Sequence, residues 1–123
     1  MIIGIHHVKL PVTDVGASRA WYERVLGFQL VMEFVEDGVV RGVALARGDV
    51  QLALRHDPER AKGLAGFDAL ALLVPAREDV RAWASRLDEA GEPHGGVVTG
   101  HRGGSVLVGL RDPDDIEIRL YAD

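Results

Sequence analysis

Apolar and polar residues alternate along most of this chain in short runs, which is the pattern of β-strands with one buried face. Seven runs bounded by Gly, Asp or Pro predict strands: HVKLPV (7–12), FQLVMEFV (28–35), VVRGVALA (39–46), VQLALR (50–55), DALALLV (68–74), SVLVGL (105–110) and IEIRLY (116–121). The glycine-rich stretch 93–104 predicts an eighth, weak strand within mobile loops, and 56–66 predicts a connector.

Two segments change to the helical period. Residues 14–26 carry apolar side chains at spacing four, namely Ala17, Trp21 and Val25. Thr13 or Asp14 can cap the start, and Gly27 supplies the stop. Residues 77–90 follow the i, i+3, i+4, i+7 pattern, namely Val80, Trp83, Ala84 and Leu87, so both tryptophans are predicted to pack in a core.

The chain repeats itself. RAWYERV (19–25) matches RAWASRL (81–87) at an offset of 62, and HVKLPV (7–12) lies over ALALLV (69–74) at the same offset. GDVQLALR (48–55) resembles DDIEIRLY (114–121) at an offset of 66. Two ordered echoes predict a duplication of a βαβββ module, with modules of about 1–60 and 66–123 in one α+β domain spanning 1–123.

Three motifs then carry a family resemblance: IHHVKLPVTD, SRAWYERVLGF and LRDPDDIEIRL. Together they resemble the vicinal oxygen chelate superfamily, which includes glyoxalase I, extradiol dioxygenases, fosfomycin-resistance enzymes and bleomycin-binding resistance proteins. The resemblance covers the whole chain. It implies that the two modules form a cupped, eight-stranded mixed sheet around one small-molecule pocket, with both helices outside, and that the protein is a homodimer.

The resemblance also implies four metal-ligand positions, two in each module. They fall on His7, Ala53, Ala69 and Arg119, so only the first keeps a donor. A catalytic divalent site generally needs about three protein ligands, and a guanidinium repels a cation. We therefore expect no metal and no other cofactor.

Strand alternation predicts which side chains face the pocket. The candidate ligand-binding residues are His7, Lys9, Phe34, Gln51, Ala53, Arg55, Ala69, Leu73, Glu117, Arg119 and Tyr121. His6 and His7 are predicted to point to opposite faces, while His94 and His101 are predicted to face solvent. The glycine-rich segment is expected to be a lid or a turn-rich edge, and no catalytic triad is visible.

Composition narrows the function. Of 123 residues, 47% are apolar and 27% charged, which is typical of a globular protein. The chain has no cysteine, which excludes thiolate chemistry. A net charge of −5 argues against nucleic acid and anionic membranes as partners and weakly favours a cationic ligand. The start has no signal-peptide pattern and no run is long enough to span a bilayer, so we expect a cytoplasmic protein.

The leading hypothesis is a metal-free protein that sequesters an apolar or aromatic natural product, giving antibiotic resistance by binding. The alternative is an enzyme of the same fold that acts on a small organic substrate. It would use His7, Glu117 or Arg119 without metal, or a metal held by atypical ligands.

Overall fold

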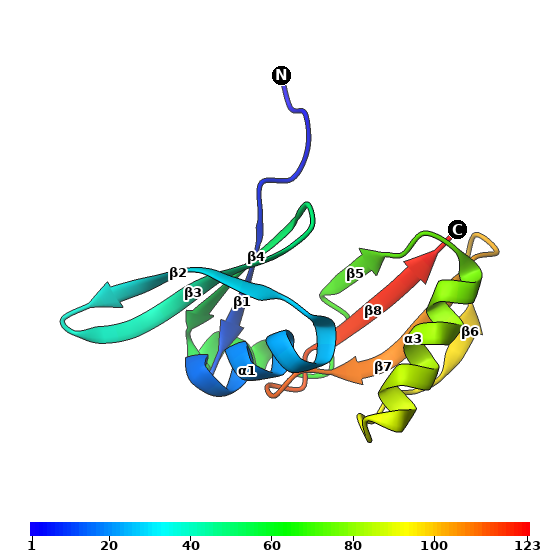
Figure 1. Ribbon diagram of the computed structural model, residues 1–123. Coiled ribbons are helices and arrows are strands. Elements are labelled where there is room, and N and C mark those ends of the chain that lie inside the picture. The colour runs from blue at the N-terminus through cyan, green and yellow to red at the C-terminus, as the bar shows by residue number, and fades with distance from the viewer. The chain divides into compact units, whose positions relative to one another are not determined.

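The computed structural model describes all residues, 1–123, and divides into two compact units, Met1–Gly63 and Leu64–Asp123. Each unit has a four-stranded sheet of its own, so the eight predicted strands occur as two sheets of four (Figure 1). That both modules make up one domain around one pocket stays a prediction. None of the helices combines the length and the apolar character needed to cross a lipid bilayer.

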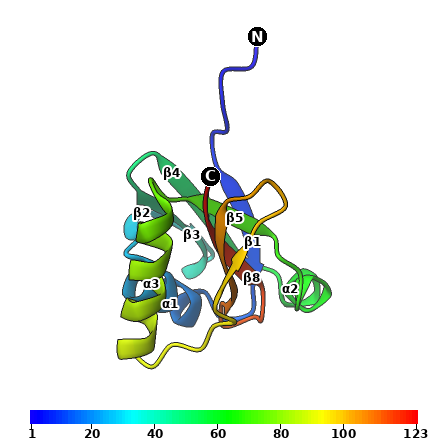
Figure 2. The ribbon, with the colours of Figure 1, turned by 90° about the vertical axis from the view of Figure 1, so that its right-hand side faces the viewer.

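Unit 1 has the predicted βαβββ order. Its elements are β1 (Val8–Val12), α1 (Val15–Leu26), β2 (Gln29–Glu36), β3 (Val39–Arg47) and β4 (Val50–His56), followed by the short helix α2 (Pro58–Leu64). The strand order in the sheet is β1-β4-β3-β2, with β1 parallel to β4 and the other pairs antiparallel. Residues 1–7 run away from this sheet as an extended segment (Figure 1, Figure 2).

Unit 2 repeats this arrangement. Its elements are β5 (Leu70–Leu73), α3 (Arg77–Glu89), β6 (Val97–Thr99), β7 (Ser105–Arg111) and β8 (Glu117–Ala122), in the sheet order β5-β8-β7-β6. Val8 is the register partner of Leu52 in unit 1, and Leu70 is the partner of Ile118 in unit 2. These pairs differ by 70 − 8 = 62 and 118 − 52 = 66 residues, so both offsets of the sequence repeat are confirmed.

The caps fix where the helices begin and end. The Asp14 carboxylate accepts a hydrogen bond from the Ala17 amide at 2.9 Å, so Asp14 is the cap and not Thr13. Gly27 ends α1 with φ 72°, a left-handed conformation that favours glycine. At the start of α3 the Asp79 carboxylate accepts from the Ala76 amide at 3.0 Å. Both helices therefore lie within one residue of the predicted bounds.

Each sheet buries one face under its helix. In unit 1, α1 packs on β3 and β4, and the buried strand residues are Leu10, Val12, Val43, Leu45, Leu52 and Leu54. In unit 2, α3 packs on β7 and β8, and the buried apolar residues of these strands are Val106, Leu107, Leu110, Ile118, Leu120 and Ala122. Trp21 is buried as predicted, whereas Trp83 is only half-buried, with the Arg86 guanidinium 4.6 Å from its ring centroid.

The connector 56–66 contains the unpredicted helix α2. The Asp57 carboxylate accepts from the Arg60 amide at 3.1 Å and pairs with the Arg60 guanidinium at 2.7 Å. The side-chain hydrogen bond from Arg60 is the main reason why the pKa of Asp57 is lowered. The signal was present in the sequence, because Asp57 and Pro58 are typical cap and first residues of a helix.

The glycine-rich segment is held by close backbone contacts. The Gly95 amide donates to the Val108 carbonyl at 2.7 Å, and a Cβ on Gly109 would lie 2.6 Å from the Gly95 nitrogen. The prediction that His94 faces solvent is wrong, because its side chain is only 9% exposed. Its Nε2 lies 2.7 Å from Asp88 Oδ1, and its Nδ1 accepts a hydrogen bond from the Gly96 amide at 3.0 Å. His101 is exposed, as predicted.

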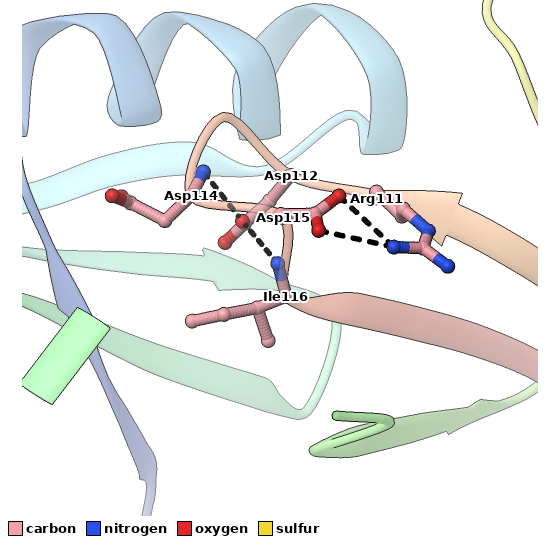
Figure 3. Close-up of polar contacts among 5 residues, drawn as sticks. All are labelled: Arg111, Asp112, Asp114, Asp115 and Ile116. Carbon is pink, nitrogen blue, oxygen red and sulfur yellow. Dashed lines mark hydrogen bonds and ion pairs between the residues drawn. The ribbon is translucent and has the colours of Figure 1, made fainter. Parts of the chain in front are cut away.

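The turn before β8 is built around a buried carboxylate (Figure 3). Asp112 is 5% exposed, and its Oδ1 accepts from the amides of Asp114 at 2.9 Å and Ile116 at 3.0 Å. Asp115 has φ 64° and its carboxylate takes two hydrogen bonds from the Arg111 guanidinium, at 3.1 and 3.0 Å. This turn sets the residue at which β8 begins and hence which of its side chains face outward.

We expect Asp112→Ala to lower the free energy of unfolding by about 1–3 kcal/mol, because two backbone donors lose their acceptor in a buried site. Urea denaturation followed by circular dichroism measures this. Asp112→Asn is the matched control, since its amide oxygen can still accept both bonds. Equal losses in the two variants would show that the acceptor geometry does not stabilise the turn.

Candidate functional site

The sheet of unit 1 has an open face opposite α1. Because side chains alternate along a strand, the residues between the buried ones point to this face. They are Lys9 on β1, Met32 and Phe34 on β2, Gly42, Ala44 and Ala46 on β3, and Gln51, Ala53 and Arg55 on β4. The candidate residues Lys9, Phe34, Gln51, Ala53 and Arg55 thus share one surface.

Two cross-strand rows give this surface its shape. One row runs from Met32 through Ala44 and Ala53 to Lys9, and the other places Phe34, Gly42 and Arg55 in register. Small residues therefore occupy this face of β3, whereas on β4 the small Ala53 stands between Gln51 and Arg55. With neighbouring strands ~4.8 Å apart, the floor between β2 and β1 is about 14 Å wide.

A cavity of about 260 Å³ lies on this face and is lined by His7, Lys9, Phe34, Ala53, Leu54 and Arg55. Five of the six module-one candidates line it, and Gln51 lies two residues before Ala53 on β4. Leu54 was not predicted. Its side chain is buried on the α1 face, so it borders the cavity with its main chain, which the side-chain pattern cannot reveal.

His7 lies just before β1, which begins at Val8. Strand alternation therefore does not separate it from His6, and the prediction that the two imidazoles point to opposite faces is wrong. Their rings meet edge to face with centroids 5.2 Å apart, and the two Nδ1 atoms are 2.9 Å apart. His7 is exposed and keeps its position on the cavity lining.

The charged groups of the cavity lining are all basic. Arg55 reaches the Glu36 carboxylate at 3.2 Å, with both side chains about half exposed. Lys9 is exposed and makes no ion pair or hydrogen bond. No Asp or Glu lines the cavity, so its local charge is positive although the chain as a whole is acidic.

On the outward face of β8, in unit 2, the candidate residues form an ion-pair network. Arg119 Nε lies 2.6 Å from the Glu117 carboxylate, and Arg119 Nη1 lies 3.2 Å from that of Asp68. Glu117 is 8% exposed, and its hydrogen bond to Arg119 is the main reason why the pKa of Arg119 is raised. Asp68, just before β5, was not predicted, because its contact joins residues about fifty positions apart.

The remaining candidates of unit 2 flank this network. Leu73 is exposed and pairs in register with Tyr121, and Ala69 is half-buried next to Asp68. Tyr121 packs so closely against the glycine-rich segment that a Cβ on Gly100 would collide with its hydroxyl. The structure therefore joins Glu117 and Arg119 into one network and leaves Leu73 outside it.

The positions that could hold a metal ion do not fit one. In unit 1 the pair is His7 and Ala53, and in unit 2 it is Ala69 and Arg119. No group of three or more His, Cys, Asp or Glu side chains comes together in the structure. Because methyl and guanidinium groups donate no lone pair, these positions do not form a divalent site.

The chain belongs to the Glyoxalase/Bleomycin resistance protein/Dioxygenase superfamily, whose family model matches residues 4–120. This confirms the resemblance that the three sequence motifs carry. A curated relative, the putative ring-cleaving dioxygenase MhqA of Bacillus subtilis (strain 168), is 27% identical over 129 aligned positions. The match covers 98% of this chain but only 40% of the relative, so the chain spans less than half of that protein.

Solved structures share the fold. Lactoylglutathione lyase from Agrobacterium tumefaciens matches with a TM-score of 0.77 at 19% identity, over 97% of this chain and 92% of the other. TnmS3, an antibiotic binding protein from Streptomyces sp. CB03234, matches with a TM-score of 0.74 at 23% identity, over 99% and 98%. The fold thus occurs in a lyase and in an antibiotic-binding protein, and by itself it does not choose between them.

We expect Arg119→Ala to lower the free energy of unfolding by about 2 kcal/mol, because it leaves the nearly buried Glu117 carboxylate without its charged partner. Chemical denaturation measures the loss. Arg60→Ala is the matched control, because the Arg60 side chain is 82% exposed and solvent weakens its ion pair with Asp57. If both substitutions cost the same, the network does not stabilise unit 2.

Proposed function

We propose that this protein is a metal-free binding protein that sequesters an apolar or aromatic small molecule, such as a ring-containing natural product. The observation that carries the proposal is the cavity on the open face of unit 1. There the resemblance implies a ligating side chain at position 53, which is alanine in this chain, and Ala53 is in register with Ala44 on β3. The scaffold of a pocket is kept, while the donors that a metal would need are replaced.

The lining has the composition of a ligand site. Phe34 is 41% exposed at one edge and offers an aromatic surface, while His7, Lys9 and Arg55 supply hydrogen-bond donors. Burial of about 200 Å² of apolar ligand surface would contribute about 5 kcal/mol before the costs of association. A flat ring system suits a floor of small side chains better than a branched ligand does.

Similar proteins support two different activities. TnmS3 is described as an antibiotic binding protein, which supports sequestration, and MhqA as a putative ring-cleaving dioxygenase, which supports the alternative of an enzyme acting on a small organic substrate. Both descriptions are compatible with a ring-containing guest. We favour sequestration because no group on the cavity is paired with another as an acid–base couple.

We further propose that the protein acts in the cytoplasm as a homodimer. The hairpin of β2 and β3 exposes four valines, Val31, Val35, Val39 and Val40, and β2 is an edge strand with unpaired backbone groups. Exposed apolar edges of this kind favour association.

Light scattering behind a sizing column should therefore give about twice the chain mass of 13.3 kDa at micromolar concentration. Val35→Lys should shift the protein toward the monomer, because it places a charge on the exposed edge. A species at the mass of one chain for the unmodified protein rules out the homodimer.

We expect Ala53→Trp to abolish ligand binding and leave the melting temperature nearly unchanged, because the new ring fills the cavity from the open face. Ala82→Trp, an equal change at an exposed position of α3, is the control and should bind normally.

Binding is measured by thermal shift against polycyclic natural products, including bleomycin-, mitomycin- and enediyne-like compounds, followed by mass analysis of each hit. A hit recovered unchanged supports sequestration. Conversion over many turnovers per chain would replace it with the enzymatic alternative. Undiminished binding by the Ala53→Trp variant would show that the ligand lies elsewhere.

A further inference from the structure

We infer that the cavity on the open face of unit 1 selects ring-containing ligands that carry an anionic group, a carboxylate or an ionised phenol, and that Lys9 binds this group. The inference rests on the proposed function and adds the charge of the ligand. It concerns the six residues that line the cavity and the way in which their charges are balanced.

The two cations on the cavity lining, Lys9 and Arg55, differ in whether an acidic side chain neutralises them. Arg55 is already compensated by the Glu36 carboxylate at 3.2 Å. Lys9 has no such partner, and no acidic side chain lines the cavity. Asp57 pairs with Arg60, and Glu33 lines a separate cavity with the start of α1. Lys9 is therefore the uncompensated permanent charge at this site.

Lys9 lies at one end of a cross-strand row on the open face of the sheet. Lys9 is in register with Ala53, which is in register with Ala44 and, through it, with Met32. A ring lying on Ala44 and Ala53 has the β2 side chains along one edge and the Lys9 stem along the other. An anionic substituent on the second edge lies within reach of the ammonium group, because a lysine side chain is long and flexible.

The net charge of the chain is opposite in sign to the charge of the cavity lining. A net charge of −5 favours a cationic ligand at long range. Solvent ions screen charges beyond roughly 8–10 Å, so groups in direct contact with a bound ligand outweigh distant ones. The cavity lining therefore favours an anionic ligand, although the net charge of the chain favours a cationic one.

The matched probes are anthraquinone-2-carboxylate and its neutral analogue anthraquinone-2-carboxamide, with titration calorimetry on the full chain at low and high salt. We expect the carboxylate to bind about tenfold more tightly, as one charge-assisted contact provides. Lys9→Gln should remove this preference and leave the affinity for the carboxamide unchanged. Lys62→Gln, which changes the chain's other lysine on α2, is the control and should keep the preference.

The outcomes separate this inference from the proposed function. Equal affinity for both probes, or a preference that survives Lys9→Gln, overturns the anion selectivity while the binding function stands. Tighter binding of a cationic anthraquinone than of the carboxylate does the same. If neither probe nor any polycyclic compound binds the unmodified protein, the proposed function fails and the inference fails with it.

Discussion

The alternation of side chains across a pleated sheet is the constraint on which the rest of this structure depends. Each four-stranded sheet buries one set of Leu, Ile and Val residues under its own helix, and the period of two then dictates which residues are left on the other face. In unit 1 that remainder consists of glycine and alanine on β3, of Gln51, Ala53 and Arg55 on β4, and of larger residues on β1 and β2. The same alternation thus determines both the core and the cavity. A shift of one residue in β4 would turn Leu54 to the cavity face and Ala53 to the core, so that neither would keep its present side chains.

Local signals explain why most of the fold could be predicted from the sequence. The caps at Asp14 and Gly27 act within four residues, and the repeat registers follow from counting positions along the chain. The contacts that were missed have no periodic signal in the sequence. The hydrogen bonds of His94 join it to Asp88 and Gly96 in the irregular segment after α3. The ion pair of Arg119 with Asp68 joins segments that are distant in the sequence. The candidate residues on unit 1 were found because their exposure follows from alternation alone, whereas Leu54 contributes main chain and left no such signal.

The turn between β7 and β8 requires a left-handed backbone at one residue. Asp115 has φ 64°, a conformation that glycine adopts more readily than aspartate does. Aspartate tolerates this region better than most residues, and the two hydrogen bonds from Arg111 hold its carboxylate in place. The buried Asp112 carboxylate organises the turn, so β8 begins at the residue that keeps Glu117 and Arg119 on its outward face.

The duplicated registers also show how the two units have diverged chemically. Lys9 and Ala53 are partners in unit 1, and the equivalent partners in unit 2 are Ala71 and Arg119. Both pairs therefore contain one cation and one alanine. In unit 1 the cation is on β1 and the alanine on β4, whereas in unit 2 the alanine is on β5 and the cation on β8. The cation of unit 2 is neutralised by Glu117 and Asp68, which makes it part of the scaffold. The cation of unit 1 has no such partners. The backbone registers are the same, but the units differ in the strand that carries the cation and in the acids beside it. This difference leaves Lys9 as the group whose charge a bound ligand can complete.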